Sequence, residues 1–168
     1  GLFKYMTKLL SQILPAFKHK IVTVDGQEIK DIEDLKNIPI SSLVFDSREV
    51  KKDSLFFALP GTHVDGNLYI PQAIKNGANA VVYQGNLSKD LQKEIAKVIV
   101  ERAIDNEIDA YGIEKEKFAP VLIKVEDSRF AMAPVSDRFY DSPSSRLIAS
   151  NASRASASSS KAIIRPFL

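Results

Sequence analysis

Four short, mainly apolar runs constrain the fold of this chain more than any other feature. They lie at residues 43–45, 55–59, 80–83 and 121–125. A strand that is apolar at nearly every position is buried on both faces, as in a parallel sheet covered by helices. The sequence therefore predicts an α/β domain with a small, mostly parallel sheet flanked by helices.

Three segments between and after these runs are predicted to be helices: 70–76, 87–108 and 126–140. Pro71 suits a first helical turn, Gly77 suits the cap that ends the same helix, and Ser88 is a candidate N-cap for the next helix. Pro134 lies inside the third segment, where proline costs about 3 kcal/mol or forces a kink.

The N-terminal part reads as a helix followed by a hairpin. Residues 2–14 are expected to form an amphipathic helix that stops before Pro15, because Lys4 and Lys8 interrupt the apolar positions that a targeting segment needs. Residues 20–29 are predicted to form a β-hairpin around an Asp-Gly turn.

These signals divide the chain into three parts. Residues 1–39 lead into the domain, residues 40–147 form the domain itself, and residues 148–168 form a tail rich in serine and alanine. Such a tail buries too little apolar surface to offset its ordering entropy, so we expect it to be disordered.

Composition excludes several function classes. The chain has 168 residues, of which 45% are hydrophobic and 26% charged, and a net charge of +2 is too small to indicate nucleic acid or a membrane surface as partner. The absence of cysteine excludes disulfides and thiolate metal sites and is compatible with the cytoplasm. We expect a cytoplasmic monomer that binds neither nucleic acid nor membranes.

Two polar turns that follow predicted strands are the candidate site. Ser47 lies between Asp46 and Arg48, so its hydroxyl could contact a uracil or ribose, while Arg48 could reach a diphosphate or pair with Asp46. His63 lies in a loop bounded by glycines whose N–H groups could form an anion-binding concavity. The alternatives are a simple turn cap with a surface ion pair for the first turn, and a surface histidine for the second.

Other chemistry finds no support. The two histidines and the carboxylates lack metal-ligand spacing, and no serine lies in a Gly-x-Ser-x-Gly turn. The last glycine is Gly112 and no Gly-Lys-Ser/Thr occurs, so no phosphate loop for ATP is visible. We therefore predict no catalytic residue, no metal ligand and no cofactor for this chain.

Five blocks resemble the N-terminal domain of the Mur ligases, the ATP-dependent enzymes that add amino acids to the UDP-linked muramyl peptide of bacterial cell walls. The blocks are residues 44–50, 55–74, 77–82, 125–129 and 138–147. The Phe-Tyr-x-x-Pro-Ser ending favours the tripeptide-forming member, UDP-N-acetylmuramoyl-dipeptide ligase. Asp53-Ser54 stands where the family often has Gly-Asp.

The resemblance implies a substrate and a set of contacts. Phe45 and Ser47, with Arg48 beside them, would line the uridine-side pocket, and Thr62, His63 and Val64 would hold the diphosphate region. The implied ligand is UDP-MurNAc-L-Ala-D-Glu, a precursor in peptidoglycan synthesis, and hence in cell shape and division.

ATP and magnesium belong to the intact family enzyme. After Leu147 the family continues into its ATP phosphate loop, whereas this chain has the serine- and alanine-rich tail. We therefore expect a substrate domain truncated before the ATP-binding domain and inactive alone. The alternatives are a non-catalytic remnant or interaction module without nucleotide binding, and the equivalent domain of the ligase that adds D-Ala-D-Ala.

Overall fold

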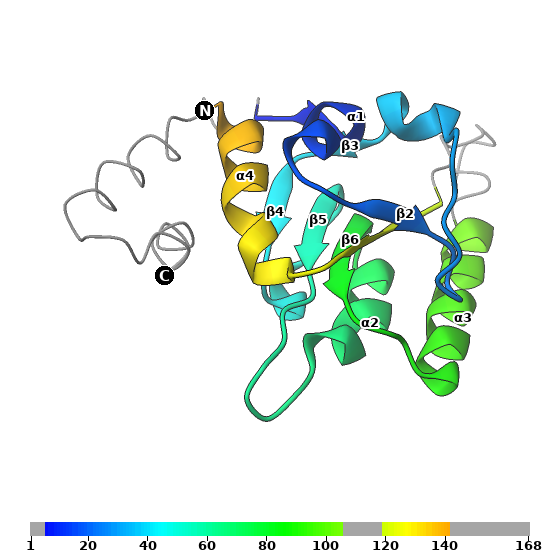
Figure 1. Ribbon diagram of the computed structural model, residues 1–168. Helices are drawn as coiled ribbons and strands as arrows, with labels where there is room; N and C mark the ends of the chain where they lie inside the picture. The colour runs from blue at the N-terminus through cyan, green and yellow to red at the C-terminus, as the bar shows by residue number, and fades with distance from the viewer. Residues whose placement is uncertain (1–5, 106–118, 142–168) are drawn as a thin grey trace.

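The computed structural model describes residues 6–105 and 119–141, and within these ranges one five-stranded sheet organises the chain (Figure 1). The strand order is β2-β7-β6-β5-β4, with bounds Lys20–Val22, Val121–Val125, Ala78–Gln84, Ser54–Phe57 and Ser42–Val44. Strands β4 to β7 run parallel, and β2 pairs antiparallel with β7. The predicted α/β domain with a mostly parallel sheet is confirmed.

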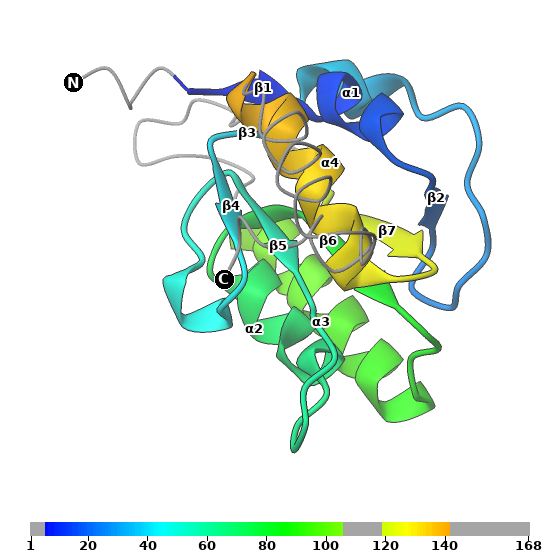
Figure 2. The same ribbon diagram turned by 60° about the vertical axis from the view of Figure 1, so that its left-hand side comes forward.

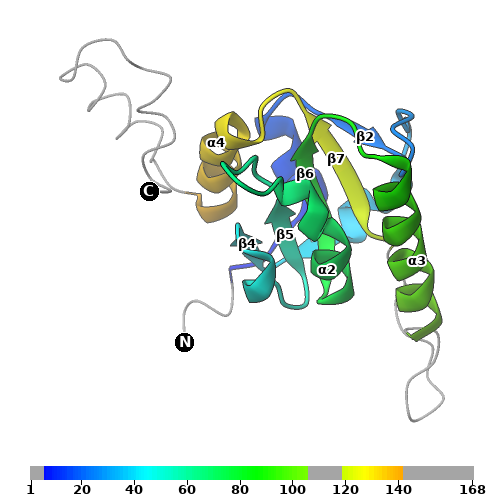
Figure 3. The same cartoon turned by 90° about the horizontal axis from the view of Figure 1, so that it is seen from below.

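Helices cover both faces of this sheet (Figure 2). The helices α1 (Leu10–Ile13) and α4 (Ser128–Tyr140) pack on one face, and α2 (Ile70–Lys75) and α3 (Lys89–Asp105) pack on the other. The view from below in Figure 3 shows α2 and α3 side by side, with α4 across the sheet from them. Each layer has its own cluster of buried apolar side chains.

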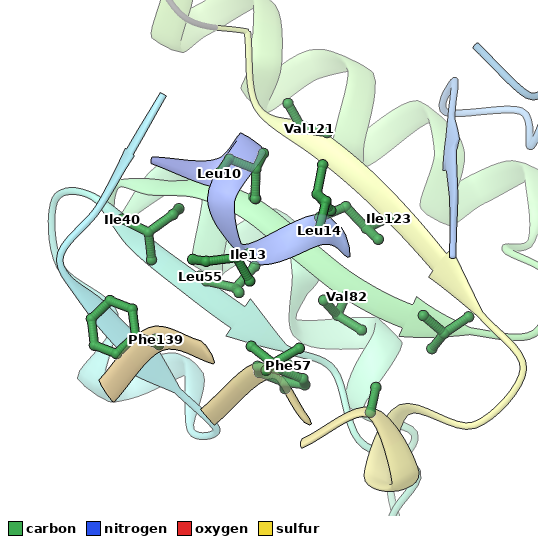
Figure 4. Packing of buried hydrophobic residues seen from close by; sticks show 14 of the residues in the cluster. Leu10, Ile13, Leu14, Ile40, Leu55, Phe57, Val82, Val121, Ile123 and Phe139 are labelled. Atoms are coloured by element: carbon green, nitrogen blue, oxygen red, sulfur yellow. The ribbon is translucent and has the colours of Figure 1, made fainter. Parts of the chain in front are cut away.

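Strand β5 shows why these runs are apolar at every position. Leu55 and Phe57 belong to the cluster under α1 and α4, whereas Phe56 and Ala58 belong to the cluster under α2 and α3. All four residues are at most 2% exposed. Figure 4 shows Leu55 and Phe57 packed with side chains of neighbouring strands beneath α1. Residues 55–58 are all apolar because their side chains alternate between two covered faces.

The predicted N-terminal helix is wrong at residues 6–9 and at its expected end before Pro15, while residues 10–14 are helical. Residues 8 and 9 form strand β1 (Lys8–Leu9), which pairs with β3 (Pro39–Ile40), and α1 has only four residues. Pro15 lies inside a 3-10 helix, η2 (Leu14–Ala16), that continues α1. The physical reason is long-range pairing: the Leu10 N–H donates to the Ile38 carbonyl at 2.8 Å, so the apolar residues are buried without a long helix.

The hairpin prediction is confirmed at its turn. The Thr23 N–H donates to the Gln27 carbonyl at 2.8 Å, and Val22 and Glu28 form a β-bridge. The first arm of the hairpin is β2. One edge of β2 faces the second arm of the hairpin, and the opposite edge pairs with β7 in the main sheet. The connection from the N-terminus therefore extends the main sheet.

The predicted helices form with shifted ends. Gly77 ends α2 in a left-handed conformation at φ +117°, and the Leu91 N–H donates to the Ser88 hydroxyl at 3.1 Å to cap α3. Pro134 lies within α4, which runs unbroken to Tyr140 because its core-facing side chains pack under the sheet. The end of the segment predicted as 87–108 and the serine- and alanine-rich tail lie outside the described residues.

Candidate functional site

A pocket of about 410 Å³ opens at the carboxyl ends of β4 and β5. Its lining combines the turn after β4 with the end of β5 and the loop that follows: Phe45, Asp46, Ser47, Arg48, Phe56, Phe57, Leu59, Val64, Gly66 and Tyr69. Small-molecule sites typically enclose about 300–1,000 Å³, and open α/β sheets bind ligands at the carboxyl ends of their strands. Both size and position mark this pocket as the candidate site.

The turn after β4 fixes Ser47 in the pocket wall. The Asp46 carboxylate accepts the Arg48 backbone N–H at 2.9 Å and so caps the 3-10 helix η4 (Ser47–Glu49). Ser47 is only 7% exposed, and its carbonyl accepts from the Asn76 amide at 3.4 Å. Among the described residues, no group hydrogen-bonds the Ser47 hydroxyl, which leaves it able to donate to and accept from a ligand.

Arg48 pairs with Asp46. The Arg48 Nε donates to Oδ1 of Asp46 at 3.0 Å, and Nη2 donates to Oδ2 at 2.7 Å. These side-chain hydrogen bonds, together with the backbone one, lower the pKa of Asp46 from 3.8 to about 2 and raise the pKa of Arg48. The sequence allowed Arg48 either to pair with Asp46 or to contact a ligand. The structure shows the ion pair with Asp46.

This pairing predicts an acid titration. The folded-state pKa of Asp46 is lowered, so its contribution to stability is present above about pH 4 and is lost as the pH falls through about 2. Both side chains face solvent, so we expect the contribution itself to be small. Carboxyl carbon NMR should give a midpoint for Asp46 near 2, and Arg48→Gln should move it back toward the ordinary value. Arg138→Gln, on a distant helix, is the control, and an unchanged midpoint in Arg48→Gln would disprove the pairing.

Aromatic rings form the apolar part of the wall. The Phe45 ring is 37% exposed and lies 5.2 Å from the buried Phe57 ring, centroid to centroid. Tyr69, at 45% exposed, also lines the pocket. Aromatic rings beside a hydroxyl and a cation suit a ligand that carries both a flat ring and an anionic group.

The loop between β5 and α2 is tied down at its base and projects from the body (Figure 1). The Gly66 N–H donates to the Leu59 carbonyl at 3.0 Å, and the Arg129 guanidinium of α4 donates to the Pro60 carbonyl at 2.6 Å. Within this loop Val64 lines the pocket, while Thr62 and His63 are exposed and outside the lining. The fold thus brings together Phe45, Ser47, Arg48 and Val64 but not the other two candidates.

Sequence reasoning did not select Tyr69 or Asp46 for the site. Tyr69 reaches the pocket through the 3-10 helix η5 (Gly66–Tyr69), which is held by the buried Asn67 amide donating to the Gln84 carbonyl at 2.8 Å. That contact joins residues 17 apart in sequence, so no short sequence motif could have predicted the position of Tyr69. Asp46 had a signal, since it directly precedes Ser47 at the end of a strand.

Within residues 6–105 and 119–141, no three histidine, aspartate or glutamate side chains could together hold a metal ion. No helix in this part of the chain is long and apolar enough to cross a bilayer.

The chain belongs to the Mur ligase family. The sequence model described as "Mur ligase family, catalytic domain" matches residues 39–140, which hold every strand and helix of the domain from β3 to α4. The family that the sequence blocks resembled is therefore confirmed.

Among curated relatives, a UDP-N-acetylmuramoyl-L-alanyl-D-glutamate--2,6-diaminopimelate ligase of Caldanaerobacter subterraneus subsp. tengcongensis is 35% identical over 118 residues, 70% of this chain and 19% of its own length. A UDP-N-acetylmuramyl-tripeptide synthetase of Roseiflexus sp. is 34% identical over 111 residues, 66% of this chain and 17% of its own length. The chain thus spans about a fifth of the length of these relatives. Both names are those of tripeptide-forming ligases, the member that the sequence favoured.

Among solved structures, the chain is similar to UDP-N-acetylmuramoylalanyl-D-glutamyl-2,6-diaminopimelate--D-alanyl-D-alanyl ligase from Acinetobacter baumannii. The TM-score is 0.45 at 15% sequence identity, covering 79% of this chain and 21% of that one.

Proposed function

We propose that this chain is a nucleotide-substrate-binding domain of a tripeptide-forming Mur ligase, and that its ligand is UDP-MurNAc-L-Ala-D-Glu. The observation that carries the proposal is the pocket at the carboxyl ends of β4 and β5, lined by Phe45, Ser47, Arg48 and Val64. The names of the tripeptide-forming relatives support the choice of ligand.

The chemistry of the lining supports the nucleotide end of this ligand as the group bound in the pocket. A pyrimidine ring can pack against the aromatic side chains of the lining, and the Ser47 hydroxyl can donate to or accept from its polar edge. Arg48 supplies positive charge for the diphosphate. We also propose that Thr62 and His63, exposed on the loop beside Val64, contact the part of the ligand that extends beyond the pocket.

The proposed contribution to a ligase reaction is binding and orientation. Holding the muramyl peptide by its remote nucleotide lets binding energy position the reacting carboxylate without a catalytic group in this domain. ATP and magnesium would act through other parts of a family enzyme, since no residue of this sequence matches a phosphate loop. We propose that the protein is cytoplasmic and monomeric. Gel filtration tests its oligomeric state directly.

Calorimetric titration of the chain with UDP-MurNAc-L-Ala-D-Glu tests the proposal. We expect saturable binding that Ser47→Ala and His63→Ala each weaken by about 1 kcal/mol, since each removes one hydrogen-bonding group. Ser88→Ala is the matched control for the first variant, because it removes a serine that caps α3 and lies outside the pocket lining. His19→Ala, the other histidine, controls the second.

The alternatives give different results. A folded chain that binds no UDP-linked ligand would be a remnant or interaction module, and the proposal would be lost. Tighter binding of the UDP-linked tripeptide than of the dipeptide would instead assign the domain to the ligase that adds D-Ala-D-Ala.

A further inference from the structure

The hydrogen bonds of Arg48 use only part of its guanidinium group. A guanidinium carries five N–H donors in one plane. Its Nε lies 3.0 and 3.2 Å from the two Asp46 carboxylate oxygens, and Nη2 lies 2.7 Å from Oδ2. The carboxylate therefore takes the Nε–Nη2 side of the fork. Among the described residues, none accepts a hydrogen bond from Nη1.

The side of the fork that remains is suited to an anion. Nη1 and Nη2 present two parallel N–H groups at the tip of the side chain, the arrangement that binds two oxygens of a phosphate or carboxylate at once. Arg48 lines the pocket. Pairing with Asp46 and binding of a ligand anion are therefore compatible, because they use different sides of the same group.

The carboxylate that holds Arg48 is itself held. Asp46 Oδ1 accepts the Arg48 backbone N–H at 2.9 Å, so the same side chain caps η4 and binds the guanidinium. The arginine side chain is 87% exposed and would otherwise sample many rotamers in solvent. Asp46 limits it to conformations in which the Nε–Nη2 side faces the turn.

We propose that Asp46 is a positioning residue: it orients Arg48 so that the Nη1–Nη2 side binds the diphosphate of a nucleoside diphosphate in the pocket. This inference rests on the proposed function and deepens it by assigning a residue that acts through another. Asp46 itself does not contact the anion.

A second Asp-Ser-Arg triplet in the chain provides an internal comparison. Asp127 follows β7 as Asp46 follows β4, and it caps α4 by accepting the Phe130 N–H at 3.0 Å. Arg129, however, donates to the Pro60 carbonyl instead of its own aspartate, and neither residue lines the pocket. The triplet alone does not produce the pair, which makes Asp127 a matched control.

The test is calorimetric titration of the chain with UDP and with uridine. Asp46→Asn keeps a good N-cap while removing the charge and one carboxylate oxygen, so the turn should persist. We expect the Kd for UDP to rise about tenfold and the Kd for uridine to change less than about twofold. Arg48→Gln should weaken UDP binding at least as much as Asp46→Asn does. Adding Asp46→Asn to Arg48→Gln should change the Kd for UDP little further. Asp127→Asn should leave both affinities unchanged.

The outcomes separate the inference from the proposed function. Equal weakening of UDP and uridine by Asp46→Asn would indicate a structural role for the carboxylate and overturn the inference. Wild-type binding of UDP with no effect of Asp46→Asn would overturn it while the proposed function stands. Failure of the wild-type chain to bind UDP or the UDP-linked dipeptide would overturn both. Circular dichroism of each variant excludes loss of fold as the cause.

Discussion

Replacing Phe57 with alanine is expected to remove about 3–5 kcal/mol from the free energy of unfolding, the range for a buried aromatic ring. Phe57 is fully buried in β5, in the cluster between the sheet and the helices α1 and α4. Figure 4 shows its ring among side chains that come from the helices as well as from the strands. Small domains are stable by only about 5–15 kcal/mol, so this loss is a large fraction of the total.

The same change should alter the pocket. The Phe57 ring lies 5.2 Å from the Phe45 ring, centroid to centroid, so Phe45 packs against it. Removing it leaves a cavity beside Phe45, so we expect weaker binding of any ligand held in the pocket that Phe45 lines, even at temperatures where the variant is folded. This links the stability of β5 to the site at its end.

Urea unfolding followed by circular dichroism measures the effect. Phe130→Ala removes the same ring from a position that is 50% exposed and should cost less than about 1 kcal/mol. Phe57→Leu keeps most of the volume and should fall between the two. A loss for Phe57→Ala no greater than that for Phe130→Ala would contradict the two-sided burial of β5.

The sheet was predictable because burial on both faces leaves a direct trace in sequence. Strands β5, β6 and β7 are apolar at most positions, and their buried apolar side chains pack under one or the other of the two helical layers. Gly77 and Ser88 predicted helix ends correctly because capping depends on local backbone geometry. These signals need no knowledge of distant residues.

The N-terminal segment was mispredicted because distant residues decide its structure. Its apolar spacing is compatible with a helix, but Lys8–Leu9 pairs with Pro39–Ile40 as a short two-stranded sheet. That pairing satisfies backbone groups and buries Leu10 at the same time. Tertiary contacts therefore override a helical pattern that is too short to be stable alone.

The candidate site was predictable where it follows strand ends. The carboxyl ends of neighbouring parallel strands lie at one edge of a sheet, so the turn after β4 and the loop after β5 meet. Tyr69 depends instead on η5 and on the contact of Asn67 with Gln84. The path of the projecting loop, which leaves Thr62 and His63 outside the lining, is set by contacts at Pro60 and Gly66 that no local pattern encodes.

Gly66→Ala is expected to cost about 3 kcal/mol of stability and to abolish the pocket. A Cβ at this position would lie 2.2 Å from the Leu59 carbonyl oxygen and 2.6 Å from the Leu59 nitrogen. Both are backbone atoms, so no side-chain rotation relieves the contact, and forced backbone shifts in packed regions typically cost about 1–3 kcal/mol or more. The hydrogen bond from the Gly66 N–H to that carbonyl, at 3.0 Å, would also be broken.

The functional consequence follows from what Gly66 holds in place. Its contact with Leu59 closes the base of the loop that carries Val64 and starts the turn that brings Tyr69 to the pocket. Separating these two backbone segments should move both side chains out of the lining. We therefore expect binding of UDP-MurNAc-L-Ala-D-Glu to fall more than tenfold, beyond the effect of Ser47→Ala.

Gly85→Ala is the matched control, because it separates steric crowding from backbone strain. Gly85 lies at the end of β6 with φ +80° and nothing within 4 Å of the position of a Cβ. Alanine there costs only the strain of a left-handed conformation, roughly 1–2 kcal/mol, because its Cβ would meet no atom of the loop after β5. If Gly66→Ala were no more damaging than Gly85→Ala in both urea unfolding and calorimetry, the loop would tolerate movement at its base, and the pocket would not depend on the close approach of Gly66 to Leu59.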